Sequence, residues 1–241
     1  MGINTDDVLK LIGERHSTRA LFDPKKSVPK EHIKKIIEAG RWAPTAHNMQ
    51  NFEIIFIEDK KILKSLADIK STPSEEFIRE NFEQLSNSEE ELKKKKVGII
   101  GTQFPPSWRD ASKLDSAVKD IKPSPLSYTI KDSPSLLIVI YDSRKRAPAS
   151  VGDILGFLSL GCVMQNMWLM AESLNVGFQI MSVFSSKDLA DKLKRTLNIP
   201  DYMEIAFAVR LGYPVSHNDY IRVRRDIEDF THYNKFGVKG F

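Results

Sequence analysis

The longest apolar stretch of the chain, residues 154–170, constrains the fold more than any other feature. Ser159, Gln165 and Asn166 interrupt it, so the sequence predicts a buried helix that is too short and too polar to cross a bilayer. The predicted helix spans residues 151–174, and its large side chains include Met164, Met167, Trp168 and Met170. A face of this composition is typical of a protein core or of a subunit interface.

The rest of the sequence predicts strands and helices around that helix. Apolar runs predict strands over residues 52–58, 135–141, 176–183 and 203–211, and helical periodicity predicts helices over residues 5–13, 29–40, 60–69 and 186–197. The run 52–57 is almost continuously apolar, which indicates a strand buried on both faces. Prolines recur through residues 104–134, so we expect an irregular lid or binding loop there. Its aromatic residues could face a planar ligand or anchor the loop to the core; they are Phe104, Trp108 and Tyr128.

The length and composition of the chain favour one ordinary globular domain. The chain has 241 residues and a hydrophobic content of 41%, and no linker rich in proline, glycine or serine divides it. We therefore predict a single domain over residues 1–241. Within it, residues 71–134 are expected to form a variable helical or lid insertion, and residues 214–241 an extended C-terminal arm that is stable only when docked.

Charge and cysteine usage exclude several classes of protein. The formal charge of +4 is spread along the chain, and the one lysine block, residues 93–96, follows the acidic residues 89–91, as on a solvated helix face. No nucleic-acid-binding motif is present, so neither nucleic acid nor a membrane is expected as a partner. The single cysteine, Cys162, is expected to be buried, and the scattered histidines predict no metal site. Without a disulfide pair or a signal segment, the chain is predicted to be cytoplasmic.

A polar turn over residues 39–52 joins a predicted helix to a predicted strand. It concentrates hydrogen-bonding side chains, namely Thr45, His47, Asn48, Gln50 and Asn51. A helix-to-strand connection needs only a few turn residues. Side chains that both donate and accept suit a ligand surface, but a solvated loop has the same composition. On these grounds alone the turn is either a binding surface or an ordinary polar loop.

Two arginine clusters lie near the ends of the chain. In the first, Arg15 and Arg19 bracket the hydroxyl groups of Ser17 and Thr18, and the second places three arginines within residues 222–225. Guanidinium groups and hydroxyls bind phosphate well, although solvated surface arginines give the same pattern. The chain contains no Gly-x-Gly-x-x-Gly, P-loop or Gly-x-Ser-x-Gly motif. Any nucleotide phosphate would therefore have to be held by these arginines.

Three of these segments, in this order, resemble the nitroreductase family of FMN-dependent oxidoreductases. Residues 15–19 resemble the N-terminal Arg-x-Ser-x-Arg motif, and Ala43-Pro44-Thr45-Ala46-His47-Asn48-Met49-Gln50 resembles the family turn Ala-Pro-Ser-x-x-Asn-x-Gln. The end of the chain, Gly212-Tyr213-Pro214 followed by residues 222–230, is similar to the closing Gly-Tyr-Pro and arginine-rich pattern. The resemblance spans nearly the whole chain and is weakest over residues 71–130.

The resemblance implies an α+β fold with a central, mostly antiparallel sheet flanked by helices, in an intertwined homodimer with FMN at the interface. NADH or NADPH would be the co-substrate, and a small planar molecule, such as a nitroaromatic or a quinone, the electron acceptor. The implied cofactor-binding residues are Arg15, His16, Ser17, Arg19, Ser182, Arg222 and Arg224 of one subunit with Pro44, Thr45, Ala46, Asn48 and Gln50 of the other. No side chain is implied as a catalytic acid, because the flavin carries the chemistry.

Two stretches depart from the family pattern, and several functions stay open. Residues 181–184 lack the glycine or glutamate that many members place beside the flavin ring, and Asn51-Phe52 replaces Pro-Trp. Within the family, the same cofactor shell also serves reductive dehalogenation and the fragmentation of reduced flavin with oxygen. Outside it, the arginine clusters would equally suit a flavin-binding or basic interaction protein without turnover.

Overall fold

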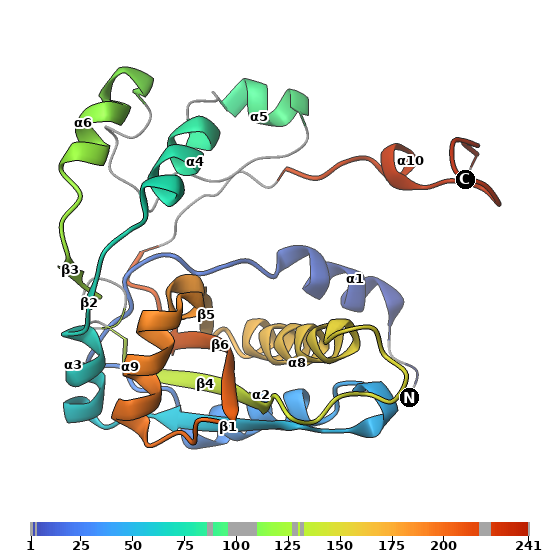
Figure 1. The fold of residues 1–241 in the computed structure, drawn as a ribbon. Coiled ribbons are helices and arrows are strands. Elements are labelled where there is room, and N and C mark those ends of the chain that lie inside the picture. The colour runs from blue at the N-terminus through green and yellow to red at the C-terminus, as the bar shows by residue number, and fades with distance from the viewer. Residues whose placement is uncertain are drawn as a thin grey trace. The chain divides into compact units, whose positions relative to one another are not determined.

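The computed structural model describes residues 2, 4–85, 89–95, 110–126, 130, 133–216 and 223–240, and the chain divides into two units (Figure 1). The first unit comprises Met1–Ser71 and Ser124–His217, and the second comprises Thr72–Pro123 and Asn218–Phe241. Most of the predicted insertion and of the predicted arm falls in the second unit. That the whole chain acts as a single domain stays a prediction.

The first unit is built on a four-stranded antiparallel sheet with the strand order β1-β4-β6-β5. The strands are β1 (Phe52–Ile57), β4 (Ser135–Asp142), β5 (Gly177–Met181) and β6 (Met203–Gly212). They lie close to the four ranges predicted from apolar runs, and the predicted α+β class with an antiparallel central sheet is confirmed. A separate two-stranded sheet pairs β2 (Lys70–Ser71) with β3 (Ser124–Pro125).

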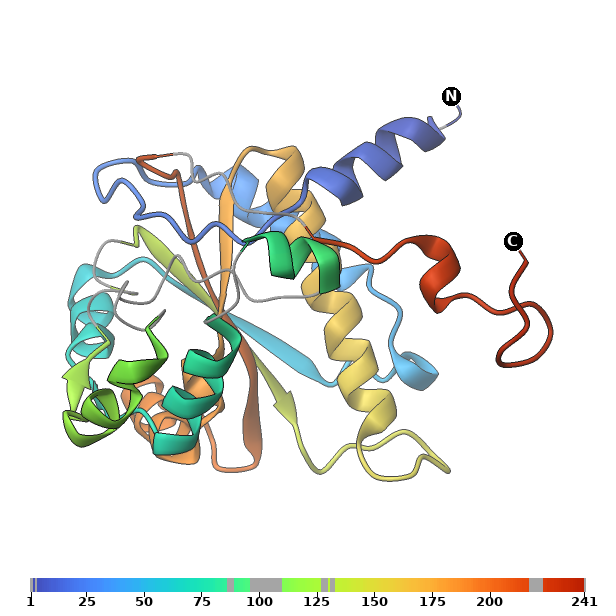
Figure 2. The ribbon, with the colours of Figure 1, turned by 90° about the horizontal axis from the view of Figure 1, so that it is seen from above.

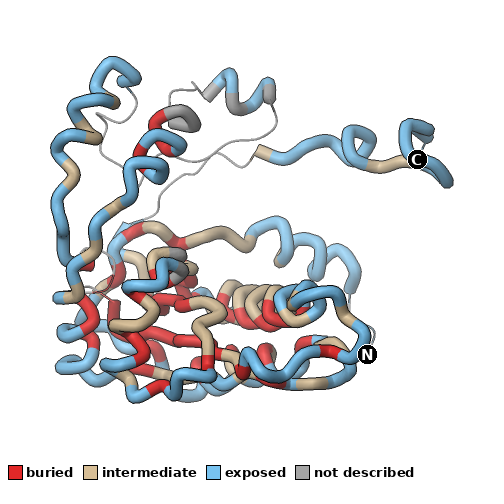
Figure 3. Tube along the Cα trace, in the orientation of Figure 1, coloured by how far each residue is buried: buried red, intermediate tan, exposed pale blue. Residues whose placement is uncertain are grey.

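Side chains of the central strand β4 alternate between two apolar cores, as a strand with a period of two requires. Leu136 and Ile138 belong to the core formed with α3 (Lys60–Ala67) and α9 (Lys187–Leu197). Leu137 and Val139 belong to the core formed with α2 (Lys30–Arg41) and α8 (Ile154–Ser173), two helices that pack against each other (Figure 2). Buried residues gather in the sheet and on the helix faces turned toward it (Figure 3).

Local sequence signals explain where these helices begin and end. The Asp59 carboxylate accepts hydrogen bonds from the backbone N–H groups of Lys61 (2.8 Å) and Ile62 (3.0 Å), so it caps α3 as its position predicts. Pro29 precedes the first residue of α2, and Ile33, Ile36 and Gly40 form the buried face of that helix. The helix α9 ends at Asn198, whose φ of 55° is the left-handed conformation of a helix C-cap.

The prediction that residues 52–57 are buried on both faces is wrong. β1 lies at an edge of the sheet and pairs only with β4 among the described strands. Glu53 is exposed, Ile57 is buried and the remaining residues of β1 are half-buried. An edge strand of an antiparallel sheet can face solvent on one side, so an apolar run alone does not report its burial.

The helix α8 also differs from its prediction. By length and composition it is long and apolar enough to cross a membrane, so it is neither too short nor too polar for that test, and only 33% of its most apolar window is buried. The core-facing side carries Leu160, Val163 and Met167, whereas Phe157 and Leu158 are exposed by 56% and 62%. A long apolar helix that is only partly buried presents a surface for contact with another molecule.

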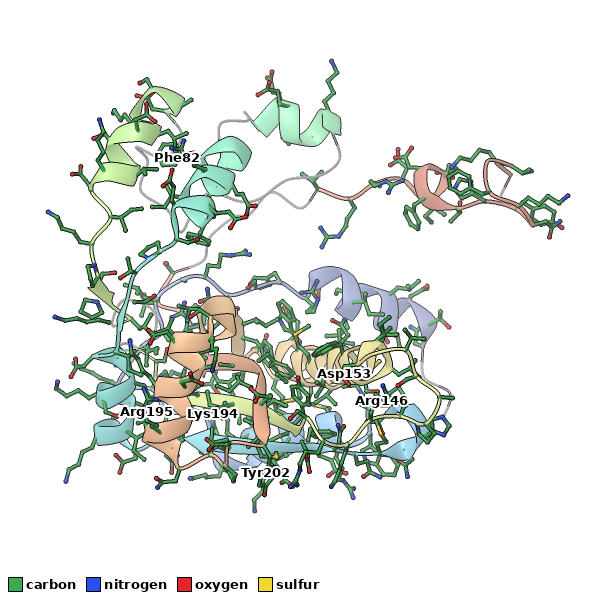
Figure 4. The ribbon with its side chains drawn as sticks, viewed as in Figure 1. Phe82, Arg146, Asp153, Lys194, Arg195 and Tyr202 are labelled. Carbon is green, nitrogen blue, oxygen red and sulfur yellow. The ribbon has the colours of Figure 1, made fainter. Side chains whose placement is uncertain are left out.

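The second unit contains short helices. These are α4 (Glu75–Leu85), α5 (Glu89–Lys95), α6 (Leu114–Lys119) and α10 (Ile227–Phe230). Phe82 of α4, labelled in Figure 4, is a buried residue of this unit. The short helix α6 forms inside the segment predicted to be irregular because residues 110–122 hold no proline. The aromatic residues of the predicted loop, Phe104, Trp108 and Tyr128, lie outside the described residues.

Candidate functional site

The first arginine cluster forms an extended segment that follows α1 (Thr5–Glu14). Arg15 is the C-cap of α1, and its backbone N–H donates to the Leu11 carbonyl (3.1 Å). From residue 17 the burial alternates, with Thr18 buried and Ser17 and Arg19 half-buried. A period of two means that Ser17 and Arg19 project to the side opposite Thr18. A hydroxyl and a guanidinium thus point outward together.

Hydrogen bonds fix this segment along the edge strand β5. The Thr18 N–H donates to the Phe178 carbonyl (3.0 Å), and the Phe178 N–H donates to the Thr18 hydroxyl oxygen (3.3 Å). Further along, Phe22 forms an isolated antiparallel bridge with Pro214. A Cβ added at Gly212 would lie 2.8 Å from atoms of Phe22, so the close approach requires glycine there. Residues 212–214, which resemble the closing pattern of the family, therefore hold the Arg15–Arg19 segment and the residues after it in place.

Arg15 and His16 lie against the C-terminal half of α8. The Arg15 guanidinium stands 4.2 Å from the centroid of the Trp168 ring, and the Trp168 indole N–H donates to the His16 carbonyl (3.0 Å). Trp168 in turn stacks on Phe178, with ring centroids 5.3 Å apart. The His16 ring nitrogen Nδ1 is 3.6 Å from a carboxylate oxygen of Glu172. The position of the Arg15 side chain is thereby set by an aromatic stack.

The polar turn is attached to the N-terminal half of the same helix. The Ala46 N–H donates to the Ser159 hydroxyl oxygen (2.9 Å), and this hydroxyl donates to the Leu155 carbonyl (2.7 Å). His47, Asn48 and Gln50 all have positive φ, between 45° and 52°. Three such residues within four positions are uncommon outside glycine and indicate a conformation held by its surroundings.

The turn presents polar groups to the surface. Pro44, Asn48 and Gln50 are exposed, and Thr45 and Ala46 are half-buried. The Gln50 side-chain amide donates to the Asn48 side-chain oxygen (2.9 Å), and the Gln50 N–H donates to the Thr45 hydroxyl oxygen (3.3 Å). The polar side chains of the turn are therefore organised among themselves.

The turn and the Arg15–Arg19 segment are attached far apart on α8. Ser159 and Trp168, their anchors on this helix, are nine positions apart, which corresponds to about 14 Å at the rise of an α-helix. Within one chain, the two predicted halves of the cofactor site are thus anchored at different ends of the helix.

An apolar pocket of about 360 Å³ lies between α8, the end of β5 and β6. Its lining includes Phe184 and also Ile180 and Met181, which belong to the stretch 180–183 that the family resemblance places beside a flavin ring. Ser182 begins the short 3-10 turn Ser182–Ser185, but its side chain lies outside what the structure describes. The volume falls in the range of small-molecule sites, which are mostly apolar.

The second arginine cluster is described only in part. Arg222 lies outside the described residues, and Arg224 is an exposed residue of the second unit whose guanidinium donates to the Val223 carbonyl (2.7 Å). Arg15, His16, Ser17 and Arg19 belong to the first unit. The role of Arg222 and Arg224 in holding a phosphate stays a prediction.

Sequence reasoning missed the buried and half-buried side chains that support the Arg15–Arg19 segment. These are Trp168 and Glu172 of α8, Gln179 of β5 and Arg210 of β6. A weak signal exists for one of them, because Arg210 is the one basic residue in the apolar run 203–211. A sequence does not reveal which partner such a residue has across the sheet.

Comparisons with known proteins identify the family of this chain. A model of the nitroreductase family matches residues 12–213. An NADPH-dependent oxidoreductase of Staphylococcus aureus strain N315 is 22% identical over 233 residues, which cover 96% of this chain and 75% of that protein. A crystal structure of a nitroreductase with bound FMN from Bacteroides fragilis has a TM-score of 0.58 at 18% identity and covers 96% of this chain and 100% of that one. An FMN-dependent nitroreductase from Clostridium difficile has a TM-score of 0.59 at 16% identity and covers 95% and 99%. With the family model matched over most of its length, the chain belongs to the nitroreductase family.

Proposed function

We propose that this protein is an FMN-dependent oxidoreductase that uses NAD(P)H to reduce a small planar acceptor, such as a nitroaromatic or a quinone. The observation that carries the proposal is the segment at residues 15–19 of a nitroreductase-family fold, where Arg15 stacks on Trp168 and where Ser17 and Arg19 are half-buried beside the buried Thr18. Relatives named as FMN-containing nitroreductases and as an NADPH-dependent oxidoreductase support it.

The donor set fits the phosphate end of FMN. Arg15 and Arg19 provide guanidinium groups, and Ser17 provides a hydroxyl, which together match a phosphate monoester carrying close to two negative charges. His16 completes the segment, and Arg222 and Arg224 are proposed to join it. The apolar pocket at Ile180 and Met181 suits the edge of the flavin ring, with Ser182 beside it.

The working unit is proposed to be a homodimer. The uncovered apolar side of α8 provides a dimer surface, and the turn is anchored about 14 Å along α8 from Trp168. The turn residues Pro44, Thr45, Ala46, Asn48 and Gln50 would therefore contact the FMN held by the partner subunit rather than their own. We propose that His47, as a residue of the turn, lies at the same subunit interface.

The residues of this chain bind and orient, and the cofactor carries the redox chemistry. The bound FMN would supply hydride-transfer chemistry through its N5 atom, between the nicotinamide and the acceptor in turn. The segment 15–19 fixes the phosphate, the turn supplies donors and acceptors for polar groups of the cofactor, and the apolar pocket keeps water from the ring. We place the enzyme in the cytoplasm.

An anaerobic titration tests the proposal. The purified protein should be yellow, lose its absorbance near the flavin band when NADPH or NADH is added, and regain it with a nitroaromatic or a quinone. The nicotinamide that bleaches the flavin faster is the preferred donor. A protein that binds no FMN and oxidises neither nicotinamide would contradict the proposal. A yellow protein that neither nicotinamide bleaches would instead be a flavin-binding protein without turnover.

The rival activities within the family differ in their products. Reductive dehalogenation would release halide from a halogenated aromatic substrate in the presence of NAD(P)H, and flavin fragmentation would consume FMN irreversibly in air. Either result in place of reversible recovery of the flavin colour would reassign the reaction while leaving the cofactor site in place.

A further inference from the structure

Arg210 of β6 is a buried cation that contacts the backbone of the Arg15–Arg19 segment and is only 3% exposed. One guanidinium nitrogen, Nη2, donates to the Ala20 carbonyl at 2.7 Å and reaches the Thr18 carbonyl at 3.5 Å. These two carbonyls flank Arg19. The guanidinium therefore holds the backbone on both sides of a residue proposed to bind phosphate.

Two further contacts orient the Arg210 side chain itself. Its Nε donates to the side-chain oxygen of Gln179, the residue directly opposite it in the register of β5 and β6. Its guanidinium also lies over the Phe22 ring, 4.4 Å from the centroid. The planar guanidinium is held at its Nε edge by Gln179 and on its face by the Phe22 ring, so it has little rotational freedom. Its remaining N–H donors therefore point in a fixed direction.

We propose that Arg210 is a positioning residue for recognition of the cofactor phosphate. Its hydrogen bonds to the carbonyls of residues 18 and 20 set the backbone so that Ser17 and Arg19 project outward toward the phosphate. This inference rests on the proposed function, because it takes residues 15–19 as the phosphate site. It adds a residue that does not touch the cofactor yet controls how well the phosphate is bound.

The geometry distinguishes positioning from a simple effect of charge. Arg210 lies on the buried side of the segment, as do the buried side chains of Thr18 and Ala20. Arg19, which is half-buried, lies on the opposite side of the same backbone. A lysine at residue 210 would keep the positive charge, but its single nitrogen could not bond to Gln179 through a fixed Nε edge while also bonding to the Ala20 carbonyl. If only charge mattered, lysine would restore phosphate binding fully.

Comparison of FMN with riboflavin, which lacks the phosphate, tests the inference. Dissociation constants of both flavins for the flavin-free protein would be measured by fluorescence quenching in the wild type, R210M and R210K. We expect R210M to raise the Kd for FMN about tenfold and to change the Kd for riboflavin less than about twofold. R210K should recover only part of the loss.

A matched control separates this effect from general destabilisation. Lys194 is another buried cation of the first unit, at 7% exposure, and its ammonium donates to the Asp201 carbonyl (3.0 Å) from α9 (Figure 4). K194M should lower the melting temperature without changing the ratio of the riboflavin Kd to the FMN Kd, which R210M should lower. If R210M does not fold, Q179M removes the acceptor of the Arg210 Nε and should lower the same ratio by a smaller factor.

The outcomes separate the inference from the function on which it rests. A wild type that binds FMN no more tightly than riboflavin contradicts the phosphate assignment, and with it the role of Arg210. A wild type that prefers FMN, together with R19A that loses this preference, supports the assignment. If R210M or Q179M then keeps the wild-type preference, or if R210K restores it fully, the positioning role of Arg210 is wrong while the function stands.

Discussion

At the scale of single residues, Asp142 at the end of β4 shows how one ion pair makes stability depend on pH. Its carboxylate accepts hydrogen bonds from the Arg144 side chain at 2.9 and 2.8 Å and from the Arg144 backbone N–H at 3.1 Å. Hydrogen bonds from the Arg144 guanidinium are the main cause that lowers the pKa of Asp142 to about 2. A lowered pKa stabilises the fold above the unfolded-state value near 3.8, and this contribution is lost as the pH falls toward 2.

The predicted result is that D142N lowers the melting temperature at pH 6 and that the difference from wild type shrinks between pH 4 and pH 2. Thermal unfolding followed by circular dichroism across this range measures it. K145M is the control, because the Lys145 ammonium is 3.9 Å from the carboxylate and its side chain is 64% exposed. A difference that stays constant down to pH 2 would contradict the ion-pair explanation.

A second prediction at this scale concerns Gly212. A Cβ at this position would lie 2.8 Å from three atoms of Phe22, so G212A should destabilise the fold by about 1 to 3 kcal/mol through overpacking. Because Phe22 follows the Arg15–Arg19 segment, FMN affinity should fall as well. G13A in α1, where an added Cβ meets nothing within 4 Å, is the matched control and should be neutral or stabilising in urea denaturation.

At the scale of elements, α8 connects the two proposed halves of the site, and Ser159 is the link to the turn. S159A removes the acceptor for the Ala46 N–H, which should cost about 1 kcal/mol of stability and loosen the turn. Equilibrium dialysis should then show weaker binding of both FMN and riboflavin, since the turn is not proposed to contact the phosphate. S173A is the control, because the Ser173 hydroxyl donates to Met170 within α8 itself.

Element positions could be predicted from the sequence to a large extent, and the reasons are local. Apolar runs located β4 and β6, and helix periodicity located α2, α3 and α9. The Arg15–Arg19 segment and the turn were also predicted as candidate surfaces. Burial of β1 could not be predicted, because it depends on which strand occupies the sheet edge. Contacts such as Arg210 with residues 18 and 20 depend on the fold as a whole, so no local pattern reveals them.

At the scale of the whole molecule, the proposed homodimer can be tested at the exposed side of α8. L158R places a charge on a side chain that is 62% exposed in the single chain and is proposed to be buried between subunits. We expect a monomer by light scattering and a strong loss of bound FMN, because each monomer would retain only half of a site. I62R changes an apolar residue of α3 that is 37% exposed and should leave both properties intact. A monomeric wild type that retains FMN would contradict the shared site.

The contacts of the Arg15–Arg19 segment also bear on the order of events during synthesis. Residues 18 and 20 are held by Phe178 and Arg210, and Leu21 accepts a hydrogen bond from the Val215 N–H (2.9 Å). These partners leave the ribosome roughly 160 to 190 residues later. The proposed phosphate-binding segment is thus translated well before the strands that hold it, and it takes its final form only after them. Flavin loading would accordingly follow the synthesis of β6, and nascent chains that end before β6 would bind no cofactor.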